Sequence, residues 1–511
     1  MKRRMKTKRH ILNYAAVALA TLAATACNDF LDEVPDNRTV IDTPEAVSEL
    51  LVSAYPDGNC VFFTECMSDN VTDRGNTLDP YVQAEWDRAN RQAFYWEDID
   101  MTYQDSPSYF WMVCYQAISA ANHALEAIAE LEAKGTDCSV QKGEALVCRA
   151  YNHFMLVNVF SQHYDPAYAD DDLGVPYVTA PEKEVFGHYE RLSVKETYDM
   201  IRADLEQGLP LISNKAYGET PKYHFTREAA QAFAARFYLY VGEWEKAAQA
   251  AGEALGDNPT LRDWNAYIQM STANREKNYT SVQESANLLL ASTLSMFAVD
   301  QPFYRYGYST AVNNSLFGQN DNLVGGTWAY RAEAYNLSSE ALTLMKWKAY
   351  KKTDGVNSNS GYYYVMVPLF TTDEAVCDRI EALAMQGRYT EACRDIELFL
   401  TNKIRDYDAA KQPVTPEMVE AYYKDKAPLH PWYESRMDAR QMAFVQCAAD
   451  FRRRELLMQG GRWFDIKRFD IEVTHEAYQT GAADVLVRRD LRRAVQIPQE
   501  VISYGIAPNP R

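Results

Sequence analysis

After its first residues, the sequence has no apolar run long enough to cross a membrane, which takes about 20 consecutive residues in helical form. The chain also lacks a CxxC motif and a histidine pair at zinc spacing. It contains no HExxH motif, nucleophile elbow or glycine-rich phosphate loop. These absences remove the usual signatures of metal sites, hydrolases and nucleotide-binding sites. We therefore expect no catalytic residues, no metal ion and no cofactor.

Basic residues are also scarce. The 511 residues include 52 Lys and Arg against 71 Asp and Glu, which gives a formal net charge of −19. Six of the basic residues, and none of the acidic ones, lie in residues 1–26, so a chain without that segment would carry −25. Nucleic acids and anionic lipid headgroups are polyanions and would be repelled. Neutral ligands such as sugars are compatible with this charge.

The N-terminus has the pattern of a processing signal. A basic start is followed by a short apolar stretch over residues 11–24, which suits a secretory signal. Ala24-Thr25-Ala26-Cys27 resembles a bacterial lipobox, in which the chain is cut before the cysteine and the cysteine is acylated. We predict a signal peptide over residues 1–26, lipidation of Cys27, and a polar tether over residues 27–43.

The eight remaining cysteines lie mostly in helical patterns, where a free thiol behaves as a small apolar side chain. We predict that they are buried thiols, and that Cys60 with Cys66 is the pair best suited to a disulfide in an oxidising compartment.

Helical periodicity is strong over residues 109–160, 194–255 and 373–404, with breaks at glycines and polar turns. Two of the breaks share one pattern. Its positions are Gly242, Trp244, Ala247, Ala251, Ala254 and Pro259 in the first copy, and Gly387, Tyr389, Ala392, Ile396 and Phe399 in the second. These are the spacings of a tetratricopeptide repeat, in which glycine permits the turn, small residues let two helices approach, and Pro ends the pair. The pattern predicts a mainly α domain over residues 44–511 with about four stacked helix pairs.

Long loop-rich regions separate these helices, at about residues 59–103 and 259–369. They are rich in polar residues and tyrosine, and we expect short β-hairpins within them, for example a strand over residues 362–368. Loops of this length are uncommon unless they have a function.

The charged run over residues 452–468 has a structural interpretation. Arginines precede Gly460-Gly461, which we expect to end a helix, and Arg462, Asp465 and Lys467 follow among aromatic residues. We predict that arginine and carboxylate groups tie together a buried turn here.

Several runs resemble one family, the SusD/RagB lipoproteins. FRRRELLMQGGRWFDIKRF at residues 451–469 and LRRAVQIPQEVISYGIAPNPR at residues 491–511 are similar to its C-terminal segment, which we place at residues 437–511. Residues 367–392 resemble its late repeat, and MSDN at residues 67–70 and YQAISAANHALEAI at residues 115–128 resemble its early part. The late repeat departs mildly from the family pattern at Arg379-Ile380-Glu381-Ala382, where Ala-Glu-Ala is common.

The resemblance implies a non-catalytic, cell-surface glycan-binding lipoprotein, held on the outer membrane of a Bacteroidetes-type bacterium by its lipid. Such a protein delivers oligosaccharide to a SusC-like TonB-dependent transporter. The family's ligand platform draws aromatic residues from the two loop-rich regions and polar groups from the segment after Ser-Asp-Asn. This implies ligand contacts from six residues: Asp69, Asn70, Arg74, Trp96, Tyr304 and Trp328.

Sugar binding has a chemical requirement that these residues would meet. The C–H faces of pyranose rings stack on exposed aromatic rings, and the hydroxyls need amide, carboxylate or arginine partners. Two alternatives stay open. The repeats could form a scaffold that binds protein or peptide, or a pair of facing carboxylates among the 71 acidic residues could hydrolyse glycans.

Overall fold

The computed structural model describes residues 41–511, apart from residues 77–81, 184–186, 219, 331–332, 335–339, 345, 356–357 and 359. The predicted signal peptide, Cys27 and nearly all of the tether lie outside the described residues. Thr43–Arg511 form one compact unit. Its long helices are α5 (Pro107–Ala133), α6 (Ser139–Phe160), α7 (Val194–Gly208), α8 (Arg227–Tyr240), α9 (Trp244–Leu255), α14 (Thr372–Met385), α15 (Tyr389–Lys403) and α17 (Ala439–Glu455).

These helices confirm the mainly α prediction, and they pack in pairs that follow one another in the chain. The pairs are α5–α6, α8–α9, α14–α15 and α16–α17, where α16 is Pro416–Tyr423. Gly242 and Gly387 both take the left-handed conformation, with φ of +76° and +72°, at the turns of the two predicted repeats. A residue with a Cβ would be strained there, which is why glycine marks these turns. After α9 the chain turns at Gly256, with φ of +64°, three residues before the predicted terminator Pro259.

Short helices occupy parts of the regions predicted to be loops. They are α2 (Pro44–Leu51), α3 (Val61–Cys66), α4 (Ala84–Phe94), α10 (Trp264–Tyr267), α11 (Thr272–Tyr279), α12 (Phe297–Asp300), α13 (Thr310–Phe317), α18 (Gly461–Arg468) and α19 (Gln499–Ser503). Gly460 was expected to end a helix. Instead α17 ends at Glu455, and Gly460, with φ of +74°, caps the start of α18.

Among the described residues, the strands form one three-stranded antiparallel sheet and three two-stranded ladders. The sheet has the order β2 (Asn287–Leu294), β7 (Gly361–Thr371), β6 (Ala349–Thr353). β7 contains the strand predicted at residues 362–368, whereas β2 was not expected. The ladders pair β1 (Thr72–Asp73) with β3 (Tyr306–Gly307), β4 (Glu333–Ala334) with β5 (Leu342–Thr343), and β8 (Val473–Glu476) with β9 (Ala483–Leu486).

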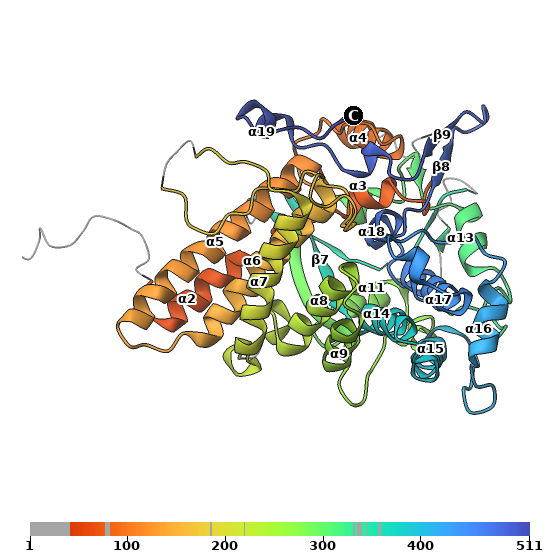
Figure 1. The fold of residues 1–511 in the computed structure, drawn as a ribbon. Helices are drawn as coiled ribbons and strands as arrows, with labels where there is room; N and C mark the ends of the chain where they lie inside the picture. Colours follow the sequence, from red (N-terminus) through yellow and green to blue (C-terminus); the bar gives the residue numbers. More distant parts are fainter. Residues whose placement is uncertain are drawn as a thin grey trace, which may run out of the picture. The chain divides into compact units, whose positions relative to one another are not determined.

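Helix α14 lies at the centre of this packing. It contacts α8, α9, α15, α17 and β7, and Figure 1 shows it between the α8–α9 pair and α17. It also buries four carboxylates, each paired with a cation from another element. The pairs are Asp373 with Lys403 at 2.7 Å, Glu374 with Arg236 at 2.7 Å, Asp378 with Arg452 at 3.0 Å, and Glu381 with Arg468 at 2.6 Å.

The predicted buried turn over residues 452–468 is present and closes on this helix. Arg452 donates to Asp465 of α18 at 3.0 Å and to Glu381 of α14 at 3.1 Å. Arg468 reaches Glu381 and Asp465 as well. Because every charge in this cluster has a charged, hydrogen-bonded partner, the cost of burying it is offset by its neighbours.

Removing one member of the cluster should therefore destabilise the whole unit. We expect Glu381→Gln to lower the free energy of unfolding by about 3–5 kcal/mol, because Arg452 and Arg468 lose their shared carboxylate in a buried site. Urea unfolding followed by circular dichroism measures this. The matched control is Glu97→Gln, which breaks an exposed pair with Arg91 and should cost less than about 1 kcal/mol. Equal, small losses in both variants would contradict the account.

Stability should also depend on pH through His153 of α6. This buried imidazole lies 2.9 Å from the carbonyl of Arg149 through Nδ1 and accepts from the amide of Val178 at 3.1 Å through Nε2, which suits the neutral ring. Burial lowers its pKa to about 3. Below pH of about 6.5 the unfolded chain therefore binds a proton that the folded chain does not, and the free energy of unfolding falls by about 1.4 kcal/mol per pH unit.

The measurement is urea unfolding at pH 7 and pH 5. His153→Gln should flatten the difference between the two, whereas His188→Gln, at a side chain that is 73% exposed, should leave it unchanged. An unchanged slope in the His153 variant would show that this residue does not contribute.

Candidate ligand-binding site

Three distant parts of the chain meet around the β1–β3 ladder. Thr72 pairs with Gly307 and Asp73 with Tyr306, which joins the two loop-rich regions. Helix α4 contacts β3, and β8 from the C-terminal segment contacts β1. The sequence order of these parts gives no hint of the arrangement, because they are separated by the repeat helices.

The Ser-Asp-Asn segment forms a buried inner layer of this region. The Asp69 carboxylate forms ion pairs with Arg462 at 2.8 Å and with Arg453 at 3.1 Å. The side-chain oxygen of Asn70 accepts a hydrogen bond from Arg453 at 2.9 Å. Burial raises the pKa of the Asp69 carboxyl, but the two guanidinium groups outweigh it and hold the pKa well below its usual range. The Glu65 carboxylate accepts hydrogen bonds from the backbone amides of residues 458 and 460. Asp69 and Asn70 thus anchor the turn between α17 and α18.

Arg74 has an internal role too. Its guanidinium donates to the backbone carbonyls of Pro302 and Tyr308, each at 3.2 Å, and to that of Tyr304. A Cβ at Gly307 would lie 2.8 Å from this guanidinium, so a larger residue where β3 passes over it would require the guanidinium to shift. Arg74 therefore fixes the backbone of residues 302–308, in the second loop-rich region.

Two of the three aromatic residues predicted to contact a ligand are buried in this region. Trp96 is 3% exposed, donates from its indole nitrogen to the carbonyl of Met67 at 2.9 Å, and stacks on His475 at 4.4 Å between ring centroids. Tyr304 is 1% exposed and packs against Phe62.

Trp328 lies elsewhere. It is 2% exposed, donates to the carbonyl of Asp321 at 3.2 Å, and has Arg454 over its ring at 4.7 Å. It contacts Phe451 of α17.

The expectation that these rings are exposed is therefore wrong. Asp69, Asn70, Arg74, Trp96 and Tyr304 do gather around β1–β3, but most of their polar atoms and ring faces are engaged by the protein itself. The Tyr304 hydroxyl and Arg74 Nε are buried without a hydrogen-bond partner among the described residues. Their direct contact with a ligand stays a prediction, which would require the covering groups to move.

Three accessible or partly accessible side chains, Tyr95, Arg305 and Tyr478, surround the buried carboxylate of Asp73 at the same place. We call these four residues the rim. Arg305 grips the Asp73 carboxylate through two hydrogen bonds of 2.8 and 2.7 Å, and its side chain remains 37% exposed. Tyr478 is 46% exposed, and its backbone amide donates to Asp73 at 3.0 Å. Tyr95 is half-buried, with its ring edge-on to Tyr306 at 5.7 Å.

The rim combines the groups that a hydroxyl-rich ligand needs. Tyr95 and Tyr478 offer aromatic rings and phenolic hydroxyls, and Arg305 offers guanidinium donors already oriented by Asp73. Gly75, with φ of +96°, lets the Tyr478 ring lie close to the backbone, since a Cβ there would be 2.9 Å from the ring. Tyr478, which lies between β8 and β9 in the C-terminal segment, was not among the residues predicted to bind a ligand.

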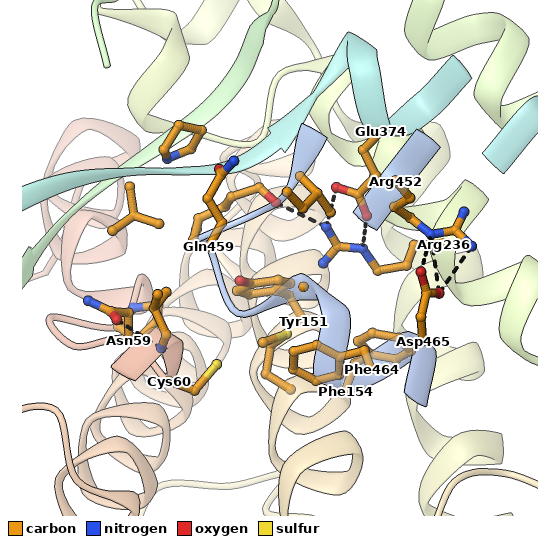
Figure 2. A pocket seen from close by; sticks show the side chains of 18 of the residues that line it. Asn59, Cys60, Tyr151, Phe154, Arg236, Glu374, Arg452, Gln459, Phe464 and Asp465 are labelled. Atoms are coloured by element: carbon orange, nitrogen blue, oxygen red, sulfur yellow. Dashed lines mark hydrogen bonds and ion pairs between the residues drawn. The ribbon is translucent and has the colours of Figure 1, made fainter. Parts of the chain in front are cut away.

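A separate cavity of about 100 Å³ lies deep among α6, α8, β7, α14 and α17–α18 (Figure 2). Tyr151, Phe154 and Phe464 form its apolar side, and the Arg236–Glu374 and Arg452–Asp465 pairs line it opposite. Pockets that bind drug-sized ligands measure about 300–1,000 Å³. The cavity can hold several water molecules but not an oligosaccharide, so it is not the candidate site.

The described residues include no group of three His, Cys, Asp or Glu side chains placed to hold a metal ion. The eight cysteines after Cys27 are free and buried, as predicted for apolar thiols, and Cys60 and Cys66 are not bridged. None of the helices in the described part of the chain combines the length and apolar character needed to span a membrane.

Comparison with known proteins finds a family match over part of the chain and a shared fold over most of it. Residues 29–239 match the SusD-like family described as "Starch-binding associating with outer membrane". The fold matches a SusD superfamily protein from Bacteroides thetaiotaomicron with a TM-score of 0.64, 17% identity, and coverage of 92% of this chain and 100% of that one. Residues 29–239 therefore resemble this family, and the chain has a SusD-like fold.

Two further SusD-like structures have the same fold. A putative sugar binding protein from Bacteroides vulgatus matches with a TM-score of 0.65 and 17% identity over 93% of this chain and 99% of that one. A SusD-like carbohydrate binding protein from the same species matches with a TM-score of 0.62 and 16% identity over 91% and 96%. A search of curated proteins finds no match. The resemblance stated from the sequence is confirmed, and at these identities the structures establish the fold alone.

The covered position of Trp96 predicts a structural role. We expect Trp96→Ala to lower the free energy of unfolding by about 3–5 kcal/mol, because it removes a buried ring from its stack on His475. Tyr504→Ala, at a ring that is 77% exposed, is the control and should leave stability nearly unchanged. Urea unfolding of both variants tests this, and a Trp96 variant as stable as the control would show that the ring is not part of the core.

Proposed function

We propose that this protein is a cell-surface lipoprotein that binds oligosaccharide and delivers it to a SusC-like TonB-dependent transporter in the outer membrane. The observation that carries the proposal is the rim, an accessible set of two tyrosines and an oriented arginine on a SusD-like frame. Two structural relatives described as sugar- or carbohydrate-binding support the ligand class. The family description supports association with the outer membrane.

Anchoring rests on the sequence. Cys27 follows the lipobox-like run, and acylation there would hold the chain at the outer membrane while residues 27–43 act as a tether. The transporter as partner rests on the family resemblance.

A binding role without catalysis is supported by the hydrogen bonds that the Asp73 carboxylate already accepts. A glycosidase needs an acid and a second carboxylate about 5–9.5 Å apart, both free to act on the glycosidic bond. Both oxygens of Asp73 already accept hydrogen bonds, from Arg305, Gly75 and Tyr478. This carboxylate is committed to orienting Arg305, which suits recognition of hydroxyl groups.

The second candidate, peptide binding by the repeats, is favoured by one feature. A groove of about 810 Å³ lies across α9, α14 and α15, and Arg379, Arg388 and Arg394 are among the residues that line it. Tetratricopeptide helices present such grooves to extended partners.

The test is binding of the purified protein to a glycan array, followed by calorimetry with the best ligand. We expect the double variant Arg305→Ala with Tyr478→Ala to weaken binding at least tenfold, because it removes an oriented donor and an exposed ring. The matched control, Arg388→Ala with Arg394→Ala in the repeat groove, should bind as the wild type does. Loss of glycan binding in the control alone would place the glycan in the repeat groove and not at the rim. Shortening of the glycan by pure protein would overturn the non-enzymatic assignment.

A further inference from the structure

The β6–β7 hairpin presents a second set of aromatic rings, away from the rim residues in sequence. In this antiparallel pair Tyr350 faces Tyr364, and Lys352 faces Tyr362. Alternate residues of a strand point to the same side, so these four side chains and Lys348 share one face. We call these five residues the hairpin face.

The rings of the hairpin face are open to solvent. Tyr350 is 47% exposed and Tyr362 is 56% exposed, while Tyr364 is half-buried. Farther along β7, Phe370 is 1% exposed and packs on Phe225 and Phe233 in the core. The C-terminal end of β7 is therefore packed in the core, whereas its N-terminal end presents aromatic rings to solvent.

Two residues from other elements complete the surface. Asp57 is exposed, and its carbonyl accepts the amide of Leu294 at the end of β2 at 3.0 Å, which holds it beside the sheet. Tyr109 of α5 packs over Gly58, where a Cβ would lie 2.8 Å from the ring. Burial, with the charges of Asp57 and Tyr364, raises the pKa of Tyr109 to about 12.

The charge of the hairpin face is opposite to that of the chain. In a protein with a net charge of −19, Lys352 of β6 and Lys348, the residue before β6, both carry positive charge beside these rings. The Lys348 ammonium lies 5.3 Å from the centre of the Tyr350 ring. Burial raises the pKa of the Asp57 carboxyl, and the charge of Lys352 opposes that rise. An ammonium beside an aromatic ring is suited to a ligand that offers a flat C–H face and a negative group together.

The surface continues from Tyr109 into a groove of about 540 Å³ along α5. Ser108 and Gln116 line it, together with Glu182 and Glu500. The two carboxylates would repel an acidic group, and Ser108 already donates to Glu500, whereas the Gln116 amide suits neutral hydroxyls. A negative group is therefore favoured at the hairpin end, and neutral sugar units along the groove.

We infer that the hairpin face is a second saccharide site, and that it takes an oligosaccharide bearing a carboxylate, such as one that contains uronic acid. This rests on the proposed function and specifies its ligand class. A protein strand is a poorer occupant of β6, because Lys348, Lys351 and Lys352 place charge along an edge strand, which discourages strand addition.

The experiment is calorimetry of the whole lipid-free chain with a panel of oligouronides made of galacturonate, mannuronate and hyaluronan fragments. Neutral oligosaccharides found on the glycan array serve as the comparison. Three variants are measured beside the wild type: Tyr350→Ala with Tyr362→Ala, Lys348→Gln with Lys352→Gln, and the rim variant Arg305→Ala. Tyr504→Ala is the control for removal of an exposed ring.

We expect at least one oligouronide to bind the wild type. Both hairpin variants should lower the affinity for it at least tenfold. The lysine variant should also lose most of the salt dependence of binding, because its charges are gone. Oligouronides that bind the hairpin variants as well as the wild type would overturn the inference, as would failure of all of them to bind. If neutral glycans still bind and depend on Arg305, the proposed function stands without the hairpin site. If no glycan binds the wild type, both fail.

Discussion

The rest of the structure depends on the charged contacts between α14 and the α17–α18 turn. Four carboxylates on one helix would be expected at a surface, yet Asp373, Glu374, Asp378 and Glu381 are buried. Each is stabilised by a cation that arrives from a different element, namely Lys403, Arg236, Arg452 and Arg468. A buried charge without its partner is costly, so these elements are stable only when all are assembled.

The same turn links the frame to the ligand-facing side. Arg453 and Arg462 lie on either side of Gly460 and hold Asp69 and Asn70, while Glu65 accepts amides of the turn itself. The segment after Asn70 then forms β1, which pairs with β3 and places Asp73 against Arg305. The orientation of the rim arginine therefore depends on contacts that begin in the repeat frame.

Much of the frame could be predicted from the sequence, and the site could not. Periodicity and the glycine at each repeat turn located α5–α9 and α14–α15 to within a few residues, because those features are local. Which rings are accessible depended on tertiary contacts: His475, from a distant hairpin, stacks on both Phe94 and Trp96 and covers the predicted ligand residue Trp96. Periodicity also missed β2, whose residues Leu288, Leu289 and Leu290 are all buried and show no alternation.

The most direct test of this account is native-state hydrogen exchange on the whole chain. If the paired charges of α14 hold the frame together, its backbone amides and those of α17 should exchange only through global unfolding, and Glu381→Gln should lower the protection of both helices equally. Exchange of α14 through a local opening, at a free energy well below that of global unfolding, would contradict the account.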